Sequence, residues 1–149
     1  MAGAGPWTLY NDFKYSAFKK LMDLSADSMK VALVTSSSNA IAATLTPATY
    51  GGINNEVANG NGYTTGGAAA GSDSLTGGGA TSTITFDVAN VSWTGSSSGF
   101  TARAAVLYDD TAASKDLIAY CLLDSAPADV TVAPGNTLTI TISNVFTAS

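Results

Sequence analysis

Residues 103–124 read RAAVLYDDTAASKDLIAYCLLD, and this stretch decides the fold. It contains two nearly continuous apolar runs, RAAVLYDD and DLIAYCLLD, joined by the short segment TAASK. Apolar runs without polar alternation are typical of strands that are covered on both faces. We therefore expect Thr101–Tyr108 and Leu117–Leu123 to be central strands of a sheet, with Asp109–Asp116 as the connection of an antiparallel pair.

Other strand signals lie on both sides of this pair. In TSTITFDV the apolar residues Ile84, Phe86 and Val88 alternate with polar ones, and TLTITISNV (137–145) alternates in the same way. A period of two residues predicts strands with one buried face. The complete set of expected strands is Met29–Thr35, Thr81–Val88, Val91–Trp93, Thr101–Tyr108, Leu117–Leu123, Val130–Val132 and Thr137–Val145.

The first 30 residues differ from the rest of the chain. They carry four lysines against three aspartates, a net charge of +1, which leaves −6 for residues 31–149. Apolar residues recur there at spacings of four, four and three, at Phe13, Ala17, Leu21 and Leu24. This period predicts one amphipathic helix over residues 11–24, with Asn11 or Asp12 as its cap.

The length of 149 residues is suited to one domain with a sizeable core. Residues 36–79 are rich in Gly, Ser and Asn and show no lasting period, so we expect a long irregular region, pinned to the body by Tyr50, Ile53, Val57 and Tyr63. The predicted fold is mainly β: an antiparallel β-sandwich or jelly-roll-like domain over 11–149, with one N-terminal helix and an N-terminal arm over 1–10.

Composition excludes several classes of site. The chain has no His, one Cys and one Glu. A Ser-His-Asp or Cys-His catalytic arrangement, a zinc site of Cys and His ligands, and an intramolecular disulfide therefore cannot form. Cys121 lies inside an apolar run and is expected to be inert core. No cofactor and no metal are expected, and no enzymatic activity.

Charge and hydropathy bear on partners. The net charge is −5 with a pI near 4.2, and the cations form no basic stripe, so nucleic acid is not expected as a partner. The N-terminal stretch MAGAGPWTLYNDFK does not resemble a signal peptide, and no segment reaches eighteen uninterrupted apolar residues. We expect synthesis in a cytoplasm and no contact with a membrane.

Three motifs could carry chemistry, and each has a simpler interpretation. The segment Gly60–Gly71 lacks the strand, helix and Lys-Ser/Thr pair of a phosphate-binding loop, so we interpret it as turns. Asp109, Asp110 and Asp116 could hold calcium, but turn carboxylates that cap backbone N–H groups are the favoured interpretation. Two carboxylates beside a groove could hydrolyse glycosides, but thinly spread aspartates and few aromatic residues argue against a sugar cleft.

The candidate partner-binding residues are Trp7, Leu9, Tyr10, Phe13 and Arg103. Three of them give the arm an apolar end, and the arm either folds back on its own domain or crosses to a neighbouring subunit as an aromatic anchor. Arg103 either pairs with a turn carboxylate or docks a partner.

Four ordered blocks resemble a known family: FKYSAFKKLMDLSADSMKVALVTSS (13–37), NEVANGNGYTTGGAAA (55–70), ITFDVANVSWTG (84–95) and TARAAVLYDD (101–110). Together they are similar to small virion structural proteins of tailed bacteriophages. The chain departs from the family pattern in its arm, MAGAGPWTLYND, and in additional Ser/Thr/Gly loops.

The resemblance implies a component of the virus particle, made in the host cytoplasm. A capsid decoration or cement protein on the shell exterior fits best, with the major capsid protein and sister copies, as dimers or trimers, for partners. A tail or tail-fibre component that attaches to the host is the alternative.

Overall fold

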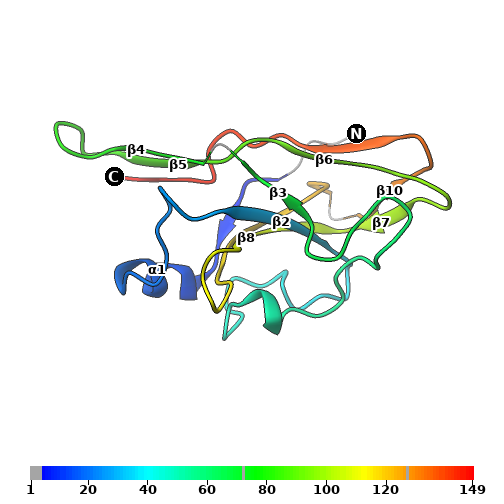
Figure 1. The fold of residues 1–149 in the computed structure, drawn as a ribbon, viewed down its shortest axis with the longest axis horizontal. Helices are drawn as coiled ribbons and strands as arrows, with labels where there is room; N and C mark the ends of the chain where they lie inside the picture. Colours follow the sequence, from blue (N-terminus) through cyan, green and yellow to red (C-terminus); the bar gives the residue numbers. More distant parts are fainter. Residues whose placement is uncertain (1–4, 72, 127) are drawn as a thin grey trace.

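A computed structural model describes residues 5–71, 73–126 and 128–149. The fold is mainly β with antiparallel sheets and one short N-terminal helix, as predicted (Figure 1). The largest sheet has five strands in the order β1 (Thr8–Leu9), β9 (Leu117–Leu122), β8 (Ala104–Asp109), β2 (Met29–Val34) and β3 (Ala68–Ala69).

The two apolar runs are central strands, which confirms the prediction. Strand β8 is buried at all six positions and pairs with β2 on one side and β9 on the other. Strand β9 lies between β8 and the short strand β1. Only a strand with neighbours at both edges and cover on both faces can bury six successive residues.

Three smaller sheets complete the fold. They pair β11 (Thr137–Ile140) with β6 (Val91–Thr94), β10 (Val130–Val132) with β7 (Phe100–Ala102), and β12 (Phe146–Ala148) and β4 (Ser74–Gly77) with β5 (Ile84–Asp87). The sheets that contain β6 and β5 form a second layer above the main sheet in Figure 1. Burial alternates along β6 and β11, where Val91, Trp93, Leu138 and Ile140 face the core. This arrangement is sandwich-like.

Three predicted strands differ from the structure by more than one residue. The run predicted as Thr81–Val88 is a strand only over Ile84–Asp87. The run predicted as Thr101–Tyr108 is divided at Arg103 into β7 and β8, which join different sheets. The run predicted as Thr137–Val145 ends at Ile140, and the separate strand β12 follows it.

The helix α1 (Asn11–Phe18) is six residues shorter than predicted. It ends where Lys20 takes a positive φ of 57°, a conformation that a right-handed helix cannot continue. The predicted caps are also wrong, because the residue before the helix is Tyr10 and no side chain caps it. The Asp12 carboxylate instead accepts the N–H of Ala48 at 3.1 Å.

Residues 5–10 of the arm fold back on their own domain, and Met1–Ala4 lie outside the described residues. Strand β1 pairs with β9, and Gly5 N–H donates to Leu122 O at 2.8 Å. The first of the two alternatives for the arm is therefore the one in this structure.

Residues 36–79 are largely irregular, as predicted, but contain the 3-10 turn η1 (Tyr50–Gly52) and strands β3 and β4. Glu56 fixes this region. Its carboxylate accepts the hydroxyl groups of Tyr50 at 2.7 Å and Tyr63 at 2.6 Å, and the N–H of Gly66 at 2.7 Å. Tyr63 and Val57 are buried, which confirms that they pin the region.

Candidate partner-binding surface

The predicted partner-binding residues of the arm and the helix are mostly buried in the core of their own domain. Tyr10 is fully buried and its hydroxyl donates to Ala40 O, and Phe13 is 4% exposed. Trp7 and Leu9 are half-buried against the same core. This corrects the expectation for Tyr10 and Phe13: their rings fill their own core and leave almost no surface for a partner.

Arg103 lies at the break between β7 and β8. Its Nε donates to Asp129 Oδ1 at 2.7 Å, so the turn carboxylate that the simpler interpretation required is present. The structure does not bring Arg103 together with the arm residues: its backbone bonds to Val34 and Leu123.

The aspartates of the β8–β9 connection have separate tasks. Asp109 is fully buried, and its Oδ1 accepts the N–H groups of Thr111 and Ala112. Asp110 pairs with Lys115 at 2.6 Å and Lys30 at 2.9 Å, and these lysines hold the pKa of its carboxyl below the ordinary value. Among the described residues, no three His, Cys, Asp or Glu side chains gather as metal ligands.

The Gly60–Gly71 segment is a series of turns, as interpreted. Gly60, Gly62, Gly66 and Gly67 all have positive φ. At Gly67 a Cβ would lie 1.9 Å from the carbonyl oxygen of Val31, so only glycine allows the chain to reach β2 here.

Cys121 lies in the core, as expected. It is 1% exposed, and burial raises the pKa of its thiol to about 12. Within the part of the chain that is described, no helix has the length and apolar character needed to cross a membrane.

Three apolar side chains are exposed on α1 and in the loop after it. Tyr15 is 63% exposed, Phe18 90% and Leu21 53%. We call these three residues the outer stripe. Tyr15 and Phe18 lie on α1, and Leu21 lies in the loop beyond its end. The sequence pattern places Leu21 on one face of a longer helix with Phe13 and Ala17, so it does not predict this exposed stripe.

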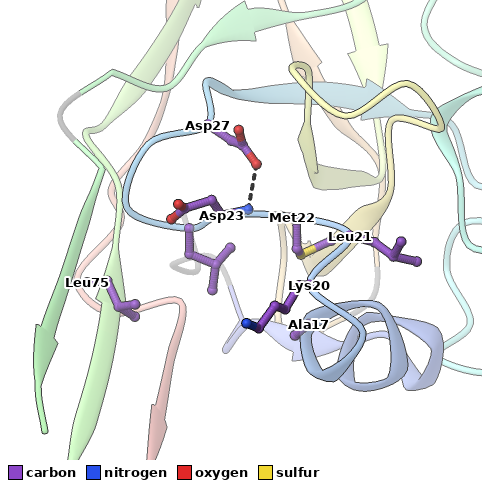
Figure 2. Close-up of a pocket in the computed structure, with 8 residues that line it drawn as sticks. Ala17, Lys20, Leu21, Met22, Asp23, Asp27 and Leu75 are labelled. Carbon is purple, nitrogen blue, oxygen red and sulfur yellow. Dashed lines mark hydrogen bonds between the residues drawn. The ribbon is translucent and has the colours of Figure 1, made fainter.

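A groove of about 510 Å³ adjoins the outer stripe (Figure 2). It lies between the end of α1 with the loop that follows and strand β4 of the opposite layer. The groove is lined by Ala17, Lys20, Leu21, Met22, Asp23, Leu24, Asp27 and Leu75. Leu21 belongs to both features, so stripe and groove form one continuous surface, which we call the docking surface.

The β4–β5 hairpin forms the other wall of the groove and projects beyond the body of the molecule (Figure 1). Near its base Phe146 packs between Phe13 and Phe86, with ring centroids 5.5 and 5.7 Å apart. On the same face of the hairpin, Leu75, which pairs with Phe86, is 43% exposed, and Ile84, farther out, is 40% exposed. The core therefore opens to solvent where the hairpin extends past α1.

The rims of the groove carry opposite charges. Lys20 lies on the helix side, and Asp23 and Asp27 on the loop side (Figure 2). The hydroxyl and N–H groups of Ser25 bond to Asp23 and lower the pKa of its carboxyl, so it stays ionised. Within the described residues, no carboxylate forms an ion pair with Lys20.

The loop 19–28 is held in place by local bonds. The N–H of Asp23 donates to Asp27 Oδ2, and Ser28 N–H donates to the Thr111 hydroxyl at 2.8 Å. Ser28 O accepts the N–H of Asp110 at 2.8 Å. These bonds tie the acidic rim to the β8–β9 connection and give the groove a defined wall.

Comparison with known proteins adds no relative: no family model, no curated protein and no solved structure matches this chain.

Proposed function

We propose that this protein is a non-enzymatic structural subunit of a tailed-bacteriophage virion, which decorates and cements the outside of the capsid shell. Its partners are the major capsid protein and sister copies. The sequence resemblance in the blocks 13–37, 55–70, 84–95 and 101–110 supports the virion assignment. The docking surface supports the role of a subunit.

One observation carries the proposal. Every large apolar side chain that is exposed among the described residues belongs to the docking surface or to the hairpin beside it: Tyr15, Phe18, Leu21, Leu75 and Ile84. Single exposed apolar residues are ordinary, but a contiguous apolar patch rimmed by polar groups is typical of an interaction site. With only 11% charged residues, the remaining surface also costs little to desolvate.

The proposed mechanism is passive adhesion. A subunit that touches several neighbours on a shell gains from high effective concentration, so each interface needs only modest affinity. Many such contacts together resist expansion of the shell.

Counting copies in purified virions tests the proposal. We expect quantitative mass spectrometry of washed particles to find this chain in hundreds of copies, as a shell lattice requires. A count of a few to some tens would contradict decoration and favour the tail alternative. Absence from washed particles, or time-dependent release of reducing ends from host envelope sugars by the purified protein, would contradict both.

A matched pair of variants tests the docking surface. Leu75→Ser removes an exposed apolar side chain from the groove. We expect its binding to shells that lack the protein to weaken, because neighbouring copies then support one another less on the shell. Thr76→Ala changes the next residue of the same exposed strand, whose side chain points to the opposite face. Equal binding by both variants would show that the docking surface takes no part in attachment to the shell.

A further inference from the structure

The docking surface contains both a projecting side chain and a recess. Phe18 projects from the last turn of α1 with 90% of its surface exposed. The apolar side chains of Ala17, Met22, Leu24 and Leu75 line the adjoining groove. Because the exposed ring directly follows Ala17 of the groove lining in the chain, two identical surfaces can each place a ring in the recess of the other.

Charge selects among the possible occupants. An acidic segment would be attracted by Lys20 but repelled by Asp23 and Asp27, which lie farther along the same wall of the groove, and a basic segment would be repelled by Lys20 in turn. A surface with a cationic and an anionic rim complements itself after a rotation of 180°. A sister copy satisfies both rims at once.

We propose that a second copy of this chain occupies the groove through a two-fold symmetric contact. Phe18 of each copy enters the groove of the other, and Lys20 of each copy faces Asp23 across the interface. The inference rests on the proposed function, because it names which of the subunit's partners this surface takes. The faces away from the groove then contact the shell.

The first test is the oligomeric state of the purified protein by sedimentation equilibrium. We expect a dimer, and Phe18→Ser should weaken it by about a hundredfold or more, because two buried rings are lost per dimer. The substitution leaves the fold intact, since Phe18 packs on almost nothing in the monomer. Circular dichroism and thermal unfolding check this.

Charge reversal gives a test that is specific for the two-fold arrangement. Lys20→Asp and Asp23→Lys each place like charges opposite one another twice per dimer, so each variant alone should dimerise about tenfold or more weakly. An equimolar mixture of the two variants should form a heterodimer with both ion pairs restored. Asp124→Lys changes the net charge as Asp23→Lys does, but lies outside the docking surface, and should dimerise like the original protein.

Several outcomes would overturn the inference: a monomer at all concentrations, a trimer, reversals without effect, or single variants that dissociate and are not rescued by mixing. The last result would show that Lys20 and Asp23 do not face each other across the interface. Failure of the proposed function is a separate result. A monomer found in hundreds of copies per virion refutes the dimer alone, and a dimer absent from virions refutes the virion role alone.

Discussion

At the scale of single residues, the one glutamate of the chain organises the irregular region. Glu56→Gln keeps the shape of the side chain but turns an NH2 group toward a donor, which leaves hydroxyl or N–H groups of Tyr50, Tyr63 or Gly66 without an acceptor. We expect the free energy of unfolding to fall by about 1–3 kcal/mol. Urea denaturation measures this loss of unfolding free energy. Tyr50→Phe, which removes one donor and keeps the ring stacked on Tyr108, should cost less, and an unchanged midpoint for Glu56→Gln would contradict the role.

A second residue-scale prediction concerns Asp109 and pH. Burial raises the pKa of its carboxyl, the N–H groups of Ala112 and Thr111 oppose the shift, and the nearby Asp27 carboxyl adds to it. The folded state therefore binds a proton more tightly than the unfolded state. Stability from this group is complete below the ordinary aspartate pKa of 3.8 and is lost as pH rises through the raised folded value.

Asp109→Asn tests the predicted direction of this pH dependence. The amide oxygen still accepts both N–H groups, and the NH2 group can donate to Asp27. We expect the variant to be more stable than the original protein at neutral pH, with a smaller decline in stability as pH rises above 3.8. Thermal unfolding of both proteins at a series of pH values measures this difference in stability. A variant that is less stable at neutral pH would show that the carboxylate is charged and favourable there.

Two residues show what the sequence could and could not predict at this scale. Cys121 was predictable as core because its neighbours are all apolar, and the structure confirms it. Asp109 was expected as a solvated turn carboxylate, and it does cap a turn, but it is fully buried. The Asp27 carboxyl beside it comes from a loop more than 80 positions earlier in the chain, which no local pattern reveals.

At the scale of elements, strand β3 depends on a close approach of two backbones. Gly67 precedes β3 with φ of 76°, and a Cβ there would collide with Val31 O. Gly78 has nearly the same φ of 80° but open space around it. Gly67→Ala should therefore cost about 3 kcal/mol or more and Gly78→Ala only about 1 kcal/mol, measured by chemical denaturation. Equal losses would mean that φ alone matters.

The elements that were predicted correctly are those with long periodic or apolar runs, such as β2, β8 and β9. The elements that were missed are β1 and β3, of two residues each, together with β4 and β12. A two-residue strand forms because the edge of a sheet is within reach. Its formation therefore depends on the partner strand and not on its own sequence. The error in α1 has a similar origin: the helical period continues to Leu24, but the backbone turns at Lys20.

At the scale of the whole molecule, the docking surface arises where two layers of unequal length meet. The hairpin of β4 and β5 extends past α1 (Figure 1). Phe86 of β5 is buried, whereas Ile84 farther out and all four residues of β4 are exposed. Sequence patterns indicate which residues are apolar, but the overhang of one layer depends on how the sheets stack. For this reason the sequence pattern points to the arm, and not to the end of the helix, as the place of partner contacts.

The arm has a different whole-molecule role, that of closing the main sheet. Strand β1 covers the outer edge of β9, the apolar run Leu117–Leu122. Removing residues 1–9 leaves that edge unpaired, and an unpaired apolar edge pairs readily with other chains. We expect the truncated protein to unfold at lower denaturant concentration and to aggregate with rising concentration, followed by light scattering. Trp7→Ala shortens a half-buried side chain but keeps the backbone pairing, so it should stay soluble. A truncated chain as soluble and stable as the original would show that β9 needs no cover, and the arm would again be available to a neighbouring subunit.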